Sequence, residues 1–170
     1  MYDGGKVMKK EKWTNVIGIL VYAALGAFIG LLFSEFVLQR VYVNGASMEP
    51  NYHDGDSVFM RKQTCFISYG DVVILEGEYK NGEHLLIKRV VGCPGDTIEI
   101  SDSGNVFRNG ELLNEAYIME KITSENRGNF FSVVLGDDEY FVMGDNRNNS
   151  WDSRMIGPIK KEKIEGIVIQ

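Results

Sequence analysis

The chain opens with a pattern that differs from everything after it. Residues 13–34 carry no charge and are mostly apolar. As an α-helix this stretch would be about 33 Å long, enough to cross the hydrocarbon core of a bilayer. Trp13 lies at the end where an interfacial aromatic residue is expected. We therefore predict a transmembrane anchor over residues 13–38.

A cleavable signal peptide is the alternative interpretation of this start. Small residues near Ala24 and Ala27 are compatible with it, but the apolar run continues past them, and a signal core is only about 7–15 residues long. We favour an uncleaved anchor. The lysine-rich residues 1–12 should then form a cytoplasmic tail. The prediction is a single-pass protein of the cell membrane, with residues 39–170 forming a domain on its outer face.

After the anchor the periodicity becomes that of strands. Short runs of β-branched and aromatic residues alternate with turn residues, and Asn81-Gly82 and Asn109-Gly110 suit hairpins. The expected strands are 39–43, 57–61, 72–76, 84–91, 97–100, 106–108, 139–143 and 164–169. No amphipathic helix, repeat or dividing linker is evident after residue 40. We predict a mainly β domain of antiparallel sheet.

Two connecting segments have a predicted form. Cys93-Pro94-Gly95-Asp96 suits a tight turn that would return Thr97–Ile100 beside the preceding strand. Residues 114–129 are polar and mixed, which indicates an excursion or a flexible flap.

Composition narrows the possible partners. The 170 residues carry a net charge of −6, which argues against a nucleic-acid partner. Two His and two Cys are too few for a convincing metal site. Cys65 and Cys93 could pair outside the cytosol, but we favour buried apolar fillers.

Ser47 is the first candidate for chemistry. The small residues Gly45-Ala46 precede it, and Pro50 can neither continue a helix nor donate to a sheet ladder. Ser47 is therefore expected at a strand end or in a turn, exposed on a stiff main chain. Such a hydroxyl suits a nucleophile, but serine needs a base to take its proton.

Lys88 is the candidate base. By period-2 alternation it shares a strand face with Leu86 and Val90, while Arg89 falls on the other face. A lysine on an apolar face must snorkel, be paired or lose its charge. Burial can lower a lysine pKa by about 3–5 units, and a neutral amine is a competent general base. The alternative is an ordinary solvated lysine on a half-buried strand.

The third stretch, Gly144–Arg154, follows an expected strand. Gly, Asp and Asn dominate turns, so an ordinary loop is the simplest interpretation. The segment is long and dense in hydrogen-bonding groups, however, and it can pack inward only if these groups satisfy one another. Asp152 and Arg154 are spaced to pair, and Ser150 and Ser153 offer short hydroxyls.

Taken together, these stretches resemble one family. Gly45–Pro50, Ile87–Asp96 and Gly144–Arg154, in this order, resemble signature motifs of bacterial type I signal peptidases, and Asp71-Val72-Val73 resembles a fourth. The resemblance runs from the N-terminal anchor to the C-terminus, and the size resembles the compact Gram-positive form. Each motif alone is weak, but all of them in order behind one anchor are a strong signal.

The resemblance implies a Ser/Lys dyad, a variant of the serine-protease triad. Ser47 would be the acylating nucleophile, Lys88 its general base, and Ser150 would orient the Lys88 amine. Two ion pairs would brace the site: Asp152 with Arg154, and Asp145 with Arg89.

The resemblance also implies the partners. The substrates would be exported preproteins with small residues at positions −1 and −3, bound as an added strand. Besides these preproteins, the lipid bilayer is the expected partner, and neither a metal nor a cofactor is needed. By similarity, the shallow substrate pockets would be lined by Val41, Val43, Met48, Val58, Leu86 and Ile87.

Some positions depart from the family pattern. Gly45 stands where some members carry a hydroxyl that helps to bind the oxyanion, so the second oxyanion donor stays open. Asn51-Tyr52 replaces the more usual Thr-Leu, and Cys93 stands where an aliphatic residue is common.

Other functions remain as alternatives. A related Ser/Lys peptidase could serve one dedicated substrate, such as a pilin or a conjugation protein. Self-cleaving repressors need a DNA-binding region that the anchor replaces here, and eukaryotic-type signal peptidases use His where this chain has Lys88. The non-enzyme alternative is a membrane-anchored β domain that binds peptides. A buried Lys88 amine within about 3.2 Å of the Ser47 hydroxyl would distinguish the dyad from that domain.

Overall fold

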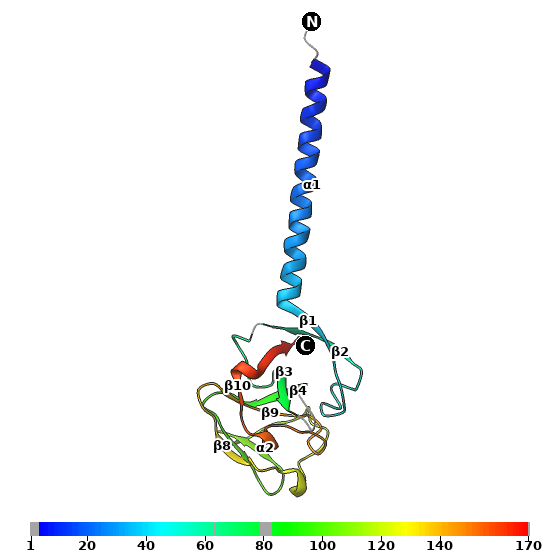
Figure 1. The fold of residues 1–170 in the computed structure, drawn as a ribbon. Helices are drawn as coiled ribbons and strands as arrows, with labels where there is room; N and C mark the ends of the chain where they lie inside the picture. The colour runs from blue at the N-terminus through cyan, green and yellow to red at the C-terminus, as the bar shows by residue number, and fades with distance from the viewer. Residues whose placement is uncertain (1–3, 63, 79–82, 170) are drawn as a thin grey trace. The chain divides into compact units, whose positions relative to one another are not determined.

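The computed structural model describes residues 4–62, 64–78 and 83–169, and the chain divides into two compact units between Val37 and Leu38. The first unit contains a helix, α1 (Gly4–Val37). The second contains the strands of two sheets (Figure 1).

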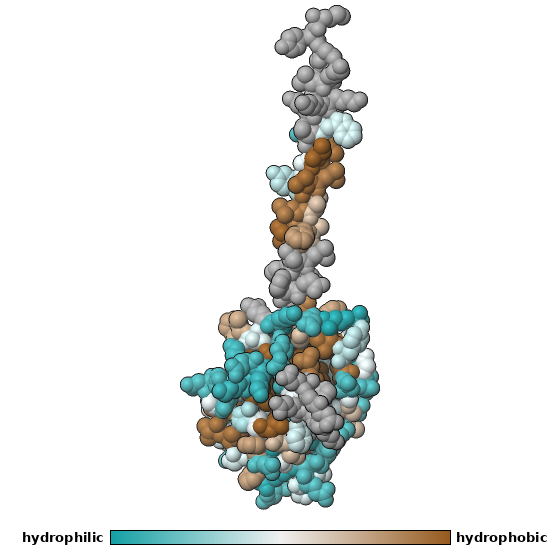
Figure 2. All heavy atoms as spheres, viewed as in Figure 1, coloured by the Kyte–Doolittle hydropathy of each residue, from teal (hydrophilic) through white to brown (hydrophobic). Residues whose placement is uncertain are grey.

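The helix α1 begins earlier than the predicted anchor. Large apolar side chains in its described part are exposed, including Ile19, Leu20 and Leu25. Most of the coloured surface of this segment is brown in Figure 2. Over the residues that the structure describes, no helix qualifies by length and apolar character as a membrane span. Residues 13–37 of the predicted anchor are helical, Leu38 begins the first strand, and the crossing of a membrane stays a prediction.

The larger sheet is antiparallel throughout, and its strands are ordered β1-β2-β11-β3-β4-β9-β10. Distant parts of the chain become neighbours in it, because β11 lies between β2 and β3, and β9 lies beside β4. The strands are β1 (Leu38–Tyr42), β2 (Ser57–Arg61), β3 (Val72–Glu78), β4 (Glu83–Gly92), β9 (Glu139–Met143), β10 (Ile159–Lys160) and β11 (Ile164–Val168).

The smaller sheet, ordered β7-β6-β5-β8, is also antiparallel. Its strands are β5 (Thr97–Ile100), β6 (Val106–Arg108), β7 (Glu111–Leu112) and β8 (Ser132–Val134). Three short helical turns complete the described part of this unit: η1 (Ser124–Asn126), α2 (Ser153–Ile156) and η2 (Lys161–Lys163).

The central strands of the larger sheet are buried on both faces. On β3, Val73 and Leu75 enter one apolar cluster, while Val72 and Ile74 enter another. Strand β9 divides its side chains in the same way between two clusters. Alternate residues of a strand point to opposite faces, so the apolar residues 72–75 of β3 require cover on both sides. A polar side chain within this covered part of the sheet, such as that of Lys88, is therefore desolvated.

Most predicted strands are confirmed, several with the same bounds. The strands β7, β8 and β10 were not predicted; β7 and β10 have two residues each, which is too short to show an alternation. Asn109 and Gly110 have φ of 54° and 80°, which makes the predicted turn between β6 and β7. Asn81-Gly82 lies outside the described residues.

The turn at residues 93–96 is confirmed, but its predicted consequence is wrong. The Asp96 N–H donates to the Cys93 carbonyl at 3.0 Å. Strand β5 then leaves the larger sheet and pairs with β6 and β8 rather than with β4. Ile98 packs so closely on the end of β4 that a Cβ at Gly92 would lie 2.8 Å from it. The chain therefore crosses the end of β4 instead of pairing beside it.

The two cysteines lie in different surroundings. Cys93 is half-buried against the core cluster that contains Val90, as expected of an apolar filler. Cys65 is exposed, so the filler interpretation is wrong for that residue.

Candidate active site

Ser47 lies in the connection between β1 and β2, on a loop that is closed at its base. The Val43 N–H donates to the Asp56 carbonyl at 2.8 Å, and the Gly55 N–H donates to the Val43 carbonyl at 2.9 Å. Inside this loop, the Gly45 N–H donates to Asp54 Oδ1 at 2.7 Å. Gly45 has a φ of 86°, a conformation that favours glycine.

Met48 anchors the turn next to Ser47. Its side chain is fully buried in the core cluster that also contains Met60 and Ile87. Its carbonyl accepts hydrogen bonds from the N–H groups of Asn51 and Tyr52, both at 3.0 Å. The hydroxyl is therefore presented on a tight turn held from within, as the sequence predicts.

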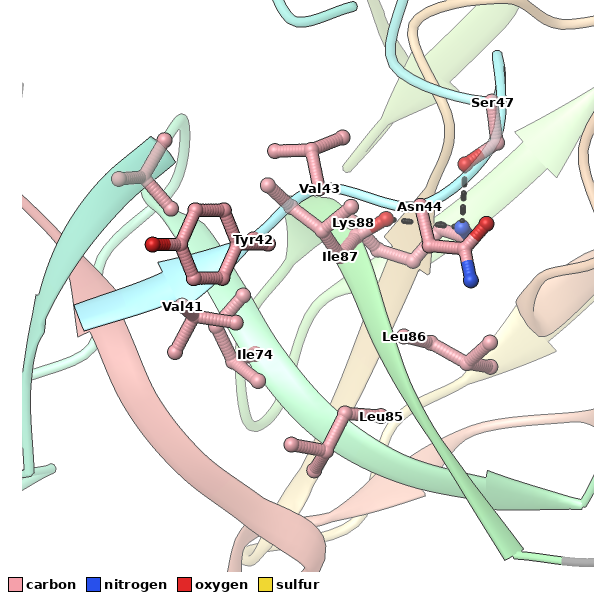
Figure 3. A pocket seen from close by; sticks show the side chains of 11 residues that line it. Val41, Tyr42, Val43, Asn44, Ser47, Ile74, Leu85, Leu86, Ile87 and Lys88 are labelled. Atoms are coloured by element: carbon pink, nitrogen blue, oxygen red, sulfur yellow. Dashed lines mark hydrogen bonds between the residues drawn. The ribbon is translucent and has the colours of Figure 1, made fainter. Parts of the chain in front are cut away.

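Lys88 points from β4 to this turn. Its side chain is 3% exposed, and the residue faces Val73 across the β3–β4 ladder. The Nζ donates to Ser47 Oγ at 2.8 Å and to the Ile87 carbonyl at 2.8 Å (Figure 3). A buried amine within reach of the hydroxyl is the geometry that separates a dyad from a solvated lysine.

Burial changes the protonation of this amine. Desolvation lowers the Lys88 pKa to about 8, while Asp152 raises it and Arg154 lowers it. With a pKa near 8, about a tenth of the molecules carry a neutral amine at pH 7, compared with well under a thousandth for an ordinary lysine. The Lys88 amine is therefore partly neutral near neutral pH.

Ser150 does not make the predicted bond to Lys88 in this structure. Its Oγ is buried and has no hydrogen-bond partner among the described residues. The Lys88 amine is held by the Ile87 carbonyl instead. Ser150 packs against Gly144, which has no side chain to separate the two.

Asp152 and Arg154 form the ion pair that their spacing suggests. Both guanidinium bonds measure 2.8 Å, and both side chains are buried. Asp152 Oδ2 also accepts from the Gly144 N–H at 3.0 Å, so the pair fixes the start of the loop after β9. Burial alone would raise the Asp152 pKa, but Arg154 outweighs it and holds the pKa below its usual value.

Asp145 and Arg89 form the second predicted pair. Arg89 donates from Nε at 2.8 Å and from Nη2 at 2.6 Å, and Asp145 is fully buried. Asn51 Nδ2 donates to Asp145 Oδ2 at 2.8 Å. This last bond ties the residues just after the Ser47 turn to the loop after β9.

The excursion at residues 114–129 contributes contacts that the sequence interpretation missed. Glu115 pairs with the buried Arg147 at 2.6 Å, and the Met119 N–H donates to the Asp145 carbonyl at 3.0 Å. Farther along, Arg154 Nη1 donates to the Asn126 carbonyl at 2.8 Å. The segment therefore packs along the 144–154 loop instead of standing free as a flap. The sequence signal for these contacts was Arg147, because it is the arginine of the 144–154 loop to which no ion-pair partner was assigned.

A cleft opens beside the Ser47 hydroxyl. Five of the six predicted pocket residues line it, and Met48 is the exception because it is buried in the core. Tyr42, Asn44, Ile74 and Leu85 also line the cleft and were not predicted. Ile74 faces Ile87 across the β3–β4 ladder, a pairing that a strand register would have revealed.

Comparisons with known proteins agree on one family. The family model described as "Signal peptidase, peptidase S26" matches residues 12–169. The chain is 34% identical to a signal peptidase I of Bacillus licheniformis over 91% of this chain and 84% of that protein. It is 35% identical to signal peptidase I T of Bacillus subtilis over 91% and 81%.

A solved structure supports the same relationship. A signal peptidase I of Enterococcus faecalis V583 superposes with a TM-score of 0.50 at 27% identity, covering 61% of this chain and 97% of that one. A nucleophile candidate, a buried amine and this fold define a serine peptidase. With the family model matching nearly the whole length, the chain belongs to the S26 family of signal peptidases, and it is an enzyme of the signal peptidase I type.

The close approach of Gly144 to the Ser47 turn yields a prediction. A Cβ at Gly144 would lie 2.5 Å from the Ser47 carbonyl oxygen and closer still to Ser150 Oγ. Gly144→Ala should therefore displace the Ser47 turn, and a shift of about 1 Å should lower kcat/KM about 100-fold. Cleavage kinetics on a preprotein would measure it, with thermal unfolding to verify the fold.

Gly136→Ala is the matched control. The nearest atom to a Cβ at Gly136 is the flexible Glu139 carboxylate at 3.3 Å, so activity should stay within about twofold. Wild-type activity in a folded Gly144→Ala variant would contradict the packing described here.

Proposed function

We propose that this signal peptidase cleaves exported preproteins through a Ser47–Lys88 dyad, after small residues at −3 and −1. The observation that carries the proposal is the 2.8 Å bond from a 3% exposed Lys88 amine to the Ser47 hydroxyl. Removal of signal peptides by a serine peptidase is the activity of the family. The assignment of residues and the Ala-X-Ala preference are the proposal.

The first half of the reaction acylates the serine. Neutral Lys88 accepts the Ser47 proton as Oγ bonds to the scissile carbonyl carbon, and the carbonyl π electrons move to its oxygen. The resulting oxyanion requires donors about 3 Å away, and the Ser47 backbone N–H is the proposed first donor. When the C–N bond breaks, the Lys88 ammonium gives its proton to the leaving amine.

The second half releases the signal peptide. A water molecule loses a proton to Lys88 as its oxygen bonds to the acyl carbon. The tetrahedral intermediate then breaks its bond to Ser47 Oγ, which regains a proton from Lys88. The enzyme returns to its starting state with one water consumed.

The main chain around the cleft supports binding of an extended substrate. Strand β4 pairs with β3 over residues 83–89, but its described ladder with β9 begins only at Arg89. Residues 85–88 therefore leave one backbone edge available, and these same residues line the cleft. A preprotein strand can add to this edge, with its small −1 and −3 side chains against Val43, Ile74 and Ile87.

We also propose that the apolar helix anchors the enzyme in the lipid bilayer, with the lysine-rich residues 1–12 in the cytosol. The uncharged run from Trp13 to Ser34 supports this, as do its exposed apolar side chains (Figure 2). A contiguous exposed apolar surface requires an apolar partner. The domain that begins at Leu38 would then work on the outer face, where exported chains emerge.

The dyad is tested by cleavage of a preprotein carrying an Ala-X-Ala site, in detergent. Wild type should cut after the second alanine, as mass spectrometry of the product will show. Ser47→Ala and Lys88→Ala should each be silent while unfolding at the wild-type temperature. Lys88→Arg should also fail, because arginine does not deprotonate near neutral pH. Full activity in a folded Ser47→Ala or Lys88→Ala variant would rule out the dyad.

Absence of cleavage by wild type would point to another function. If the preprotein binds without being cut, a dedicated substrate or the peptide-binding alternative gains weight.

The lowered Lys88 pKa predicts the pH dependence of the reaction. Only the neutral amine can act as base, so kcat/KM should rise about tenfold per pH unit below the pKa and level off above it. The midpoint should lie near 8, since burial lowers the Lys88 pKa to about that value. A kcat/KM profile from pH 6 to pH 10 measures it. A midpoint near 10.4, the value of an ordinary lysine, would argue against a desolvated base.

Membrane anchoring is tested by alkaline carbonate extraction of cell membranes. The wild-type chain should stay in the pellet. A variant with Val21→Lys and Leu25→Lys should be released, because a lysine at the centre of an apolar helix costs about 2.5–3.5 kcal/mol. Phe66→Lys, at a position 78% exposed in the β domain, is the control and should behave as wild type. Release of the wild-type chain would contradict the anchor.

A further inference from the structure

One residue outside the dyad, Asn146, bonds to the main chain on both sides of the Ser47 nitrogen. Asn146 lies in the loop after β9 and is 7% exposed. Its Nδ2 donates to the Ala46 carbonyl at 3.1 Å, and its backbone N–H donates to the Ser47 carbonyl at 3.1 Å. A single residue from a distant segment therefore fixes two successive carbonyl groups, those of Ala46 and Ser47.

The first of these bonds determines where the Ser47 N–H points. The Ala46 carbonyl and the Ser47 N–H belong to one peptide unit, which is planar and trans, so the two groups point in opposite directions. A donor that fixes the carbonyl oxygen thereby fixes the direction of the N–H. This N–H is the first oxyanion donor of the proposed reaction.

The Ser47 N–H is also unoccupied. Among the described residues, none accepts a hydrogen bond from it. The Ala46 carbonyl receives one other bond, from the Glu49 N–H at 3.3 Å. That bond is longer and comes from within the same turn, so it does not fix the turn relative to the rest of the site. The Asn146 bond, in contrast, fixes the Ala46–Ser47 peptide unit relative to the sheet that carries Lys88.

Asn146 is itself held from both sides. Asp145 before it pairs with Arg89 of β4, and Arg147 after it pairs with Glu115 at 2.6 Å. The two pairs are buried, and breaking a buried pair typically costs about 3–5 kcal/mol. The loop backbone at Asn146 is therefore fixed relative to β4, which is the strand of the base.

We propose that Asn146 is a positioning residue that aims the Ser47 N–H at the oxyanion formed on the substrate. The inference rests on the proposed function, because it concerns the intermediate of that reaction. It accounts for a site in which Gly45 supplies no hydroxyl to the oxyanion, since the remaining backbone donor must then be well oriented.

The test compares Asn146→Ala with Asn148→Ala. Asn148 is a matched control from the same loop, because its amide also bonds to backbone groups, those of Lys121 and Thr123, and none of these bonds reaches the Ser47 turn. On the Ala-X-Ala preprotein, Asn146→Ala should lower kcat about 10- to 100-fold with KM changed less than about threefold. Asn148→Ala should retain kcat within about twofold.

Two inhibitors separate orientation of the donor from general loss of structure. A peptide ending in alanine aldehyde adds Ser47 Oγ to its carbonyl carbon, and the Ser47 proton ends on the hemiacetal oxygen or on Lys88. The same peptide ending in the alcohol occupies the cleft without forming a bond. Asn146→Ala should weaken binding of the aldehyde by about the factor lost in kcat and should leave binding of the alcohol unchanged.

Equal losses for the aldehyde and the alcohol would overturn the proposal, as would wild-type kcat in Asn146→Ala or an equal loss in Asn148→Ala. If Asn146→Ala does not fold, Asn146→Ser carries the same measurements. If neither folds, Asn146 supports the fold rather than one peptide unit, and the proposal fails. A wild-type enzyme that never cleaves the preprotein would instead refute the proposed function.

Discussion

The candidate site is organised around one hydrogen bond between a buried amine and a serine hydroxyl. An isolated ammonium group in an apolar interior is too costly, so Lys88 can be buried only if its neutral form is accessible. Desolvation provides this by lowering the pKa to about 8. The hydroxyl of Ser47 and the carbonyl of Ile87 then satisfy the amine without placing a charge beside it. The surrounding sheet and loops exclude water from this amine.

The charges near the amine are arranged in pairs for the same reason. Asp152 and Arg154 act on the Lys88 pKa in opposite directions, so their pairing leaves desolvation as the dominant effect. An unpaired Asp152 would stabilise the ammonium form of Lys88 and lower the fraction of neutral amine near neutral pH. The pair also fixes Gly144 through its backbone N–H. One ion pair therefore serves both the electrostatics and the geometry of the site.

The site is assembled from segments that are far apart in the chain. The Ser47 turn lies between β1 and β2, Lys88 lies on β4, and the loop after β9 joins them through Asn146 and Asp145. The segment at 114–129 closes the other side of that loop. Buried ion pairs have few alternative geometries, so they locate these segments with less freedom than apolar contacts would allow. The family comparisons are consistent with this plan over nearly the whole chain.

Much of the fold and of the candidate site could be predicted from the sequence, since both left local signals. Period-2 alternation located the longer strands, and Asn109-Gly110 specified a hairpin by its φ preference. Ser47 and Lys88 stood out because each had unusual neighbours: small residues and a proline for one, apolar strand companions for the other. The motif order then indicated the family before any contact was known.

The tertiary structure alone decided how these local pieces meet. It sent β5 into a second sheet, buried Met48 instead of placing it in the cleft, and left Ser150 Oγ without the expected bond to Lys88. It also chose Glu115 as the partner of Arg147 and placed Asn146 against the Ser47 turn. Periodicity and turn chemistry are properties of neighbouring residues, so the sequence determines them directly. The packing of the whole core decides which distant polar groups form pairs. A pairing is more favourable than contact with water only where both groups are buried.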